Sequence, residues 1–150
     1  MRATICKPET VELQIKSATI LSTDEVLKLP VAIRRTGYWW WLRSPDSRDA
    51  HYVAAVMSDG HISPFCFHVS ADYGVRPAFV VSNLEDFNCV IGDTITIKSK
   101  RYVVIDTNKI LYNDEPVRCQ FNGKNSNDYE TSDLKQFVDG WLKDLKNETH

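Results

Sequence analysis

Long apolar runs are missing from this 150-residue chain, and none approaches the ~18 residues that a membrane span requires. Its first ten residues hold no apolar signal region. No C-x-x-C spacing, as in zinc knuckles or thioredoxin-type motifs, occurs among its four cysteines: Cys6, Cys66, Cys89 and Cys119. We therefore expect a cytoplasmic protein with reduced thiols, two disulfides being the alternative.

An excess of one charge is missing too. The chain has 18 basic and 20 acidic residues and a net charge of −2, spread evenly along its length. This balance gives no electrostatic footprint for nucleic acid, and we expect neither a nucleic-acid nor a membrane partner. Gly-rich phosphate loops, Ser-His-Asp arrangements and paired catalytic carboxylates are absent by motif, so no cofactor is expected.

What the chain does have is the composition of a globular protein, with 43% hydrophobic and 25% charged residues. Its length fits a single domain, which we expect over 1–150 as two intertwined segments, about 11–82 and 88–146. The stretch 82–88 is the only plausible internal boundary. The predicted class is α+β with an antiparallel, β-rich body.

Aromatic residues gather in the segment YWWWLRSP at 38–45, which holds three of the four tryptophans. In a strand, Trp39, Trp41 and Arg43 share one face, and the bulky residues between them share the other. Such a strand should be central and covered on both sides. The guanidinium of Arg43 is then placed to stack on Trp41.

Hydrophobic periodicity predicts the remaining elements. A capping box of Ser22 and Glu25 starts a short helix near 23–29, which Pro30 ends. An apolar stripe predicts a C-terminal amphipathic helix near 132–146, with Thr131 or Ser132 as N-cap. The other expected elements are strands at 11–21, 51–57, 65–69 and 75–81, turns at 58–60 and 72–74, a hairpin of 94–97 with 102–105, and a loop at 122–128. Because Pro77 cannot donate to a ladder, the strand at 75–81 should be an edge strand or contain a bulge.

Three motifs, WWLRSP at 40–45, SDG at 58–60 and GVRPA at 74–78, resemble a family of domains of unknown function that is widespread in gut bacteria and their phages. The second half resembles the segment usually found in the family's N-terminal half, so its order looks circularly permuted. The pattern is similar to that of C-type-lectin-like domains, including the formylglycine-generating enzyme group and the variable proteins of diversity-generating retroelements. This resemblance implies a fold and no activity, since fold does not fix function.

Residues with catalytic or metal-binding chemistry are scattered. Cys66 and His68, two positions apart, have the residue types of a nucleophile and base, but a core cysteine beside a polar histidine is the favoured interpretation. A metal site could be built from His51, His61, His68, Asp49 and Asp59, against the simpler interpretation of unrelated surface residues. A calcium site could draw on Asn122, Asn125, Asn127, Asp128 and Glu130, against that of a solvated loop.

Two arginines lie within apolar strands and should be buried and paired. Arg43 and Arg76 then need carboxylate partners, for which Asp59, Asp72 and Asp93 are plausible; a ligand anion is the alternative. Removal of the Arg43 side chain should destabilise the fold markedly. The expected structural signature is Trp40, Arg43, Asp59, Arg76 and Trp141.

The sequence favours a small non-enzymatic binding module of phage or prophage type, cytoplasmic or virion-associated, that recognises a protein or a glycan. Loops on a rigid sheet are where binding usually resides, and the loops expected here are 46–50, 61–64 and 122–127. Their candidate contact residues are Asp46, Arg48, Asp49, His51, His61, Asn122 and Asn125. An intracellular inhibitor of a host defence protein is the second hypothesis, and an enzyme the third.

Overall fold

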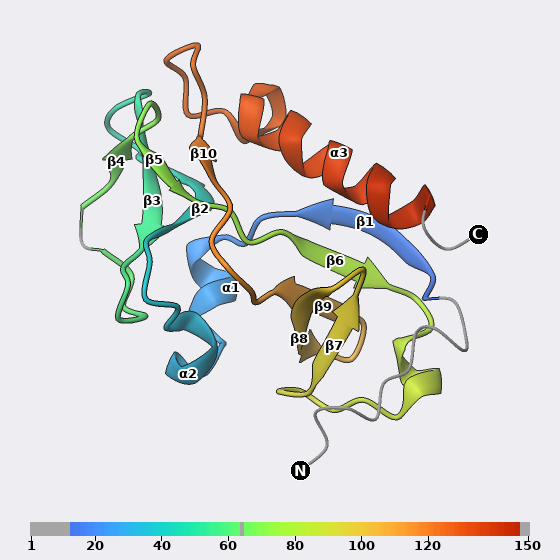
Figure 1. Cartoon of the computed structure of the whole chain (residues 1–150). Coiled ribbons are helices and arrows are strands. Elements are labelled where there is room, and N and C mark those ends of the chain that lie inside the picture. Colours follow the sequence, from blue (N-terminus) through green and yellow to red (C-terminus); the bar gives the residue numbers. More distant parts are fainter. Residues whose placement is uncertain (1–12, 64, 148–150) are drawn as a thin grey trace. The chain divides into compact units, whose positions relative to one another are not determined.

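The computed structural model describes residues 13–63 and 65–147 (Figure 1). The chain divides into two compact units. Unit 1 comprises Met1–Thr19, Pro77–Glu115 and Asp139–His150, and unit 2 comprises Ile20–Arg76 and Pro116–Val138. The stretch 82–88, expected as an internal boundary, lies inside unit 1. The single-domain organisation of 1–150 stays a prediction.

The predicted fold class is confirmed: the protein is α+β and rich in antiparallel strands. In the part of the chain that the structure describes, α3 (Asp133–Asn147) is the only long helix. None of the helices built from these residues combines the length and the apolar character needed to span a bilayer.

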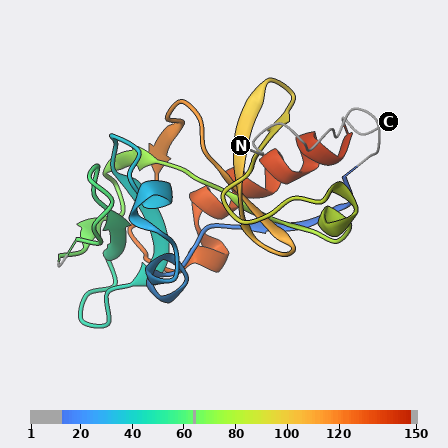
Figure 2. The same ribbon diagram turned by 90° about the horizontal axis from the view of Figure 1, so that it is seen from below.

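Unit 1 contains a five-stranded sheet in the order β1-β6-β9-β8-β7. Its antiparallel strands are β1 (Ile15–Thr19), β6 (Ala78–Val81), β7 (Thr94–Ile97), β8 (Lys100–Asp106) and β9 (Lys109–Tyr112). The hairpin expected around 98–100 is confirmed as β7 and β8, with Lys98 and Ser99 in the left-handed region that tight turns need. β1 and β6 pair although they are far apart in sequence, as Figures 1 and 2 show.

The core of unit 1 is organised around Trp141 of α3. Its ring contacts Phe79 of β6 and Tyr112 of β9, with ring centroids 6.5 and 4.8 Å away. The indole Nε1 of Trp141 donates to the hydroxyl of buried Tyr102 at 3.0 Å. Half-buried Trp141 therefore packs on the sheet as the stripe predicts, and Leu145 of the same stripe is buried. Phe137 lies at the edge of the stripe and remains 42% exposed.

Ser132 is the N-cap of α3, one of the two residues expected in that role. Its hydroxyl accepts from the Lys135 amide at 3.0 Å and donates to the Tyr129 carbonyl at 2.8 Å. Tyr129 belongs to a short 3-10 turn, η2 (Tyr129–Thr131), that leads into the helix. A second 3-10 turn, η1 (Leu84–Phe87), occupies most of the stretch once expected as a boundary.

Unit 2 contains a second five-stranded sheet, in the order β10-β5-β2-β3-β4. Its strands are β2 (Trp40–Pro45), β3 (Tyr52–Val56), β4 (Phe67–His68), β5 (Asp72–Gly74) and β10 (Arg118–Gln120). As predicted, the tryptophan strand β2 is central, and Trp40, Trp41 and Leu42 have no exposed surface. β2 pairs with β3 antiparallel and with β5 in parallel.

The segment 72–74, expected as a turn, is strand β5, and Gly74 explains the difference. A Cβ at this position would lie 2.5 Å from the Tyr38 ring and 3.0 Å from the Trp39 carbonyl oxygen. The Gly74 amide donates to that same carbonyl at 2.8 Å. The glycine therefore permits a close approach between two strands. Glycine is also common in turns, so the sequence Asp-x-Gly is compatible with either structure.

Both prolines that were expected to limit an element stand just before one. Pro77 directly precedes β6, so the strand itself contains no proline. β6 lies between β1 and β9 and is therefore an interior strand, not the edge strand that was expected. Pro30 follows α1 (Thr23–Leu27) and is the N-cap of a further short helix, α2 (Val31–Arg34), which the sequence interpretation missed. Proline suits the start of a helix because its fixed φ is already helical and its missing amide proton is not needed there.

The capping box of α1 is confirmed and extends to Arg43. The Ser22 hydroxyl accepts from the Glu25 amide, and the Glu25 carboxylate accepts from the Ser22 amide at 2.8 Å. Arg43 Nη1 donates to this carboxylate and to the Ile20 carbonyl, each at 2.6 Å. The expected aspartate partner and the stacking on Trp41 are therefore wrong for Arg43, which is also 34% exposed rather than buried.

Arg76, in contrast, has no exposed surface. Its guanidinium carbon lies 4.5 Å from the centroid of the Trp40 ring, and its Nη1 donates to the Ile33 carbonyl at 2.9 Å. Burial lowers the pKa of Arg76 to about 10, so the group stays charged at neutral pH. The stacked arginine is thus Arg76 on Trp40. Helix α2, absent from the sequence interpretation, supplies its carbonyl partner.

The cysteines differ in state. Cys66 and Cys119 are free, whereas Cys89 is disulfide-bonded. The expectation of reduced thiols is therefore wrong for Cys89. Disulfides were only the alternative in the sequence interpretation, because cysteine spacing reveals a pairing only when the pattern is a known one.

Candidate functional site

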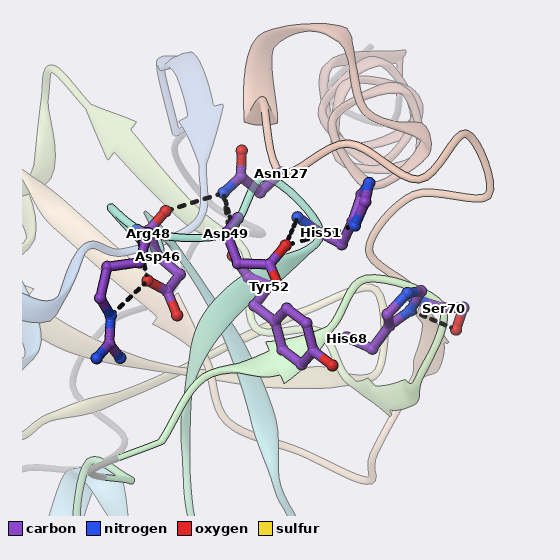
Figure 3. A network of polar contacts seen from close by, with 8 residues as sticks. All are labelled: Asp46, Arg48, Asp49, His51, Tyr52, His68, Ser70 and Asn127. Carbon is purple, nitrogen blue, oxygen red and sulfur yellow. Dashed lines mark hydrogen bonds and ion pairs between the residues drawn. The ribbon is translucent and has the colours of Figure 1, made fainter.

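Two of the three expected binding loops meet at one side chain, that of Asn127 (Figure 3). Its Nδ2 lies within hydrogen-bond distance of the main-chain carbonyls of Asp46, Asp49 and Tyr52, at 3.3, 3.2 and 3.1 Å. Its main-chain amide donates to the Ala50 carbonyl at 2.7 Å. Loop 46–50 is therefore fastened to the loop that ends at residue 127, which lies 75 to 81 positions away in the sequence.

Loop 46–50 is also ordered from within by Asp46. One carboxylate oxygen of Asp46 accepts from the Arg48 amide at 2.8 Å and lies 3.5 Å from Arg48 Nε. The backbone hydrogen bond from Arg48, aided by its charge, lowers the pKa of Asp46. The carboxylate is held inward, with 13% of the side chain exposed, and the Arg48 side chain is 88% exposed. The loop thus presents a cation on a fixed backbone.

Two histidines lie beside this loop, His51 directly before β3 and His68 in β4. His51 Nδ1 is 3.4 Å from the Asp49 carboxylate, and His68 Nδ1 is 2.7 Å from the Ser70 hydroxyl. The two imidazole rings are 6.1 Å apart between centroids. The pairing of Tyr52 with His68 between β3 and β4 sets this spacing. The histidines therefore contribute polar ring edges to the same surface, each with its own partner (Figure 3).

Cys66 does not have the properties of an activated nucleophile. Burial raises the pKa of its thiol, and the nearby Asp46 carboxylate raises it further. A thiol in this environment is protonated at neutral pH, whereas reactive cysteines have a depressed pKa. The Nδ1 atom of His68 faces Ser70, which it contacts through both the hydroxyl and the amide. The chemistry expected of a Cys–His pair is therefore not what this geometry favours.

Of the other predicted contact residues, His61 lies at another turn, Asn122 is buried and Asn125 lies in loop 122–127. His61 and Asp59 pair with each other at 3.2 Å, next to the turn that follows β3. Asn122 is 1% exposed; its side chain donates to the Ser126 carbonyl and accepts from the Lys124 amide, so it shapes loop 122–127. Asn125 is exposed, with a left-handed φ of 65°. Of the loop 61–64, residue 64 lies outside the described residues.

Metal ligation was the alternative interpretation of these histidines and carboxylates. Among residues 13–63 and 65–147, no three His, Cys, Asp or Glu side chains come together as a metal ion would require. Asp59 pairs with His61 at its turn, and Asp49 pairs with His51. The Asp128 carboxylate accepts from the Glu130 amide and caps η2. These side chains serve local structure within their own loops.

Asn127 is the organising residue that the list of contact candidates missed. The sequence named it only among possible calcium ligands. The contacts of this one amide require three main-chain carbonyls to converge in space. The spacing of residues within 46–52 does not predict this convergence. The signal that was available is chemical: an asparagine in a polar loop has a donor group able to replace missing backbone partners.

Comparison with known proteins gives one match. A family model described as "Domain of unknown function (DUF6273)" matches residues 8–83, slightly more than half of the chain. No curated protein and no solved structure matches the chain. The matched residues include the tryptophan segment, loop 46–50 and both histidines described above.

Proposed function

The chain belongs to the DUF6273 family of domains of unknown function, and we propose that it is a small, non-enzymatic binding module for a protein or a glycan. The proposed contact surface is formed by loops 46–51 and 122–127 of unit 2. Its polar groups are the guanidinium of Arg48, the carboxylate of Asp49 and the imidazole of His51. We call this surface the loop surface.

The observation that carries the proposal is the hydrogen bonding of the Asn127 side chain to the main chain of loop 46–50 and of Tyr52. The two N–H groups of the Asn127 side chain, shared among three main-chain carbonyls, fix the path of the loop while residues 47–50 stay exposed. A loop held in this way loses little conformational entropy when a ligand binds, and such preorganisation raises affinity. Arg48, at 88% exposed, and His51, at 48%, are the side chains that such a surface offers to a partner.

The resemblance of the sequence supports a setting for this module. Its motifs are similar to those of domains of gut bacteria and their phages, with a permuted order of segments and a C-type-lectin-like fold. We include these features in the proposal, together with a cytoplasmic or virion-associated location. Domains of this kind place binding residues on loops above a rigid sheet, which fits the position of the loop surface.

The test is binding by matched variants of the full chain. Wild type, Arg48→Ala, His51→Ala and Lys16→Ala would be compared on a glycan array and in pull-downs from bacterial lysate. Lys16 is exposed in β1 of unit 1, so Lys16→Ala removes the same charge from another surface. Thermal unfolding of each variant confirms that it is folded.

The proposal predicts a ligand retained by wild type and by Lys16→Ala, and retained at least several-fold less by Arg48→Ala and His51→Ala. Equal retention by all four proteins would place binding elsewhere. A retained host enzyme whose activity falls would favour the inhibitor hypothesis. Turnover that disappears in His51→Ala or His68→Ala would overturn the non-enzymatic assignment.

A further inference from the structure

The contacts of His51 and His68 determine which ring nitrogen of each side chain carries the proton. The two rings lie on neighbouring segments of unit 2, with centroids 6.1 Å apart and planes tilted by 36°. In a neutral imidazole one nitrogen carries the proton and donates, while the other accepts. The partner of each Nδ1 atom therefore decides what the ring offers to a ligand through its Nε2 atom.

In His68, the Nδ1 atom is an acceptor. It accepts from the main-chain amide of Ser70 at 3.1 Å, and the Ser70 hydroxyl lies 2.7 Å from the same atom. Because a main-chain N–H can only donate, Nδ1 carries no proton in this arrangement. The proton of neutral His68 therefore lies on Nε2, where the ring offers an N–H donor.

In His51, the arrangement is reversed. Its Nδ1 atom lies 3.4 Å from a carboxylate oxygen of Asp49, and the same oxygen accepts from the His51 main-chain amide at 2.9 Å. Because a carboxylate can only accept, it favours the proton on Nδ1. Neutral His51 then offers the lone pair of Nε2 as an acceptor. Within residues 13–63 and 65–147, no hydrogen bond uses the Nε2 atom of either ring.

The two rings together form a matched donor and acceptor at the surface. Figure 3 shows them side by side, His51 extending from the end of loop 46–51 and His68 from β4. His51 is 48% exposed, and half-buried His68 contacts the Tyr52 ring edge-on, 5.5 Å away between centroids. The pairing of Tyr52 with His68 between β3 and β4 holds the donor ring in place. With hydrogen bonds of about 2.9 Å, this spacing suits a ligand whose donor and acceptor groups are on neighbouring atoms.

The surroundings of this pair favour a neutral ligand rich in hydroxyl groups. Arg48 lies beside Asp46, and Asp49 lies beside His51, so the loop has no unmatched cluster of one charge. Protein interfaces centre on large, mostly aromatic anchors. In the described part of the chain, the exposed large hydrophobic residues all lie outside loops 46–51 and 122–127, β3 and β4; Phe65, two residues before β4, is the nearest in sequence, and the others are Leu27, Val90, Ile91 and Phe137.

On the basis of the function proposed for the loop surface, we propose that His51 and His68 bind two neighbouring hydroxyl groups of a glycan. One hydroxyl donates to Nε2 of His51, and the adjacent hydroxyl accepts from the Nε2–H group of His68. Because a hydroxyl rotates to donate or to accept, a vicinal diol satisfies both rings without changing the tautomer of either. The ligand of the loop surface is then a glycan rather than a protein, and β4 adds to the contact area.

The experiment begins with the histidine tautomers of the full, 15N-labelled chain. Long-range 1H–15N correlations at about pH 8, where imidazoles are ordinarily neutral, should show the proton of His51 on Nδ1 and that of His68 on Nε2. The signals are assigned by their loss in His51→Asn and His68→Asn.

The probes are methyl α-glycosides of glucose, galactose and mannose, each paired with its fully O-methylated counterpart, which keeps the sugar ring but has no hydroxyl donor. At least one free glycoside should shift the signals of both His51 and His68 saturably. Its O-methylated counterpart should leave the His51 signal unshifted, because nothing then donates to Nε2. The comparison uses the wild-type chain and needs no variant to fold.

Matched variants then separate the two contacts. His51→Asn and His68→Asn remove the Nε2 atom and should each weaken the responding glycoside about 2- to 10-fold, the size of one hydrogen bond. His68→Gln returns an amide N–H to the reach of Nε2 and should recover part of the loss. His61→Asn is the control, because His61 is exposed at another turn of unit 2, and it should leave the affinity unchanged.

Four results would overturn the inference. Absence of a His51 and His68 shift with all three glycosides at their solubility limit would show that the pair binds no diol. Equal shifts from a glycoside and its O-methylated counterpart would show a contact without the donor to His51. The opposite tautomer in either ring would remove the matched donor and acceptor. A protein retained through Arg48 without any glycoside response would overturn the glycan assignment and leave the proposed binding function in place.

Discussion

The two sheets of this protein differ in how much of their aromatic clusters they bury. In unit 1, Phe79, Tyr102 and Tyr112 have no exposed surface, and only Trp141 of α3, which packs on them, is half-buried. In unit 2, the cluster that begins inside with Trp41 and Phe121 continues outward to half-exposed Trp39, Phe67 and Tyr73. Both sheets have five strands, so strand number does not explain the contrast. A fold can finish its core with part of an aromatic cluster and leave the rest half-exposed.

The two sheets also differ in how their strands are held together. Neighbours β7, β8 and β9 of unit 1 are joined by short turns, so backbone ladders hold them together. In unit 2, β4 has two residues and β5 and β10 have three each. Such short strands form few backbone hydrogen bonds, and side-chain hydrogen bonds add to them. Asn127 secures a loop, and Trp41 Nε1 donates to the Cys119 carbonyl at 2.9 Å. Unit 2 therefore depends more on individual side chains.

The largest effect is expected from truncating the buried part of the unit 2 cluster. Trp41→Ala should lower the free energy of unfolding by about 3–5 kcal/mol, the cost of removing a large core ring. Trp39→Ala should cost much less, because Trp39 is half-exposed. Chemical denaturation of both variants checks this. Equal losses would mean that the cluster is one continuous core, and the contrast between the units would fail.

The next effect concerns the fastening of loop 46–50. Asn127→Ala removes the amide that donates to three main-chain carbonyls and should cost about 1–3 kcal/mol. The matched control is Lys124→Ala in the same loop, whose side chain is exposed. Hydrogen exchange should quicken at the Arg48 and His51 amides in Asn127→Ala. Unchanged exchange there would show that the loop does not depend on Asn127.

A smaller effect is expected from the pair of Arg43 and Glu25. Burial opposes ionisation of Glu25, but hydrogen bonds from Arg43 and the Ser22 amide outweigh it, and its pKa falls below the ordinary 4.5. The contribution is present above pH 4.5 and disappears as the pH drops through the folded pKa. Arg43→Ala should cost about 1 kcal/mol at pH 7, because the pair is partly exposed.

The control for this pair is Glu25→Gln, which keeps the shape of the side chain. Melting temperatures measured from pH 7 to pH 3 should converge for wild type and Glu25→Gln as the pH falls. Parallel curves would show that ionised Glu25 adds no stability. A loss of several kcal/mol in Arg43→Ala would instead support the original expectation of a buried arginine.

An effect of similar size is expected inside unit 1. Tyr102→Phe removes the hydroxyl that accepts from Trp141 Nε1 and should cost about 1 kcal/mol. Burial raises the pKa of Tyr102 to about 12, so this phenol should ionise well above pH 10 in an absorbance titration. Loss of one such late-titrating group in Tyr102→Phe identifies it. A Tyr102 that titrates near pH 10 would contradict its burial.

The sequence predicted the parts of this fold that depend on neighbours in the chain. The capping box of Ser22 and Glu25, the hairpin of β7 and β8, the central position of β2 and the stripe of α3 all follow from local spacing. The partner of Arg76 could not be predicted, because it is a main-chain carbonyl of α2, 43 positions away. The role of Asn127 was hidden for the same reason.

The hydrogen bonds of the Asn127 side chain determine which substitutions the loop surface can accept. All three acceptors of its side-chain amide are main-chain oxygens, which every amino acid possesses. Substitutions at residues 47 and 48, or at the exposed side chain of 49, leave those acceptors in place. The loop is thus held through main-chain atoms, whereas a ligand would contact its side chains. A library of variants at these positions could therefore alter recognition while the loop keeps its path.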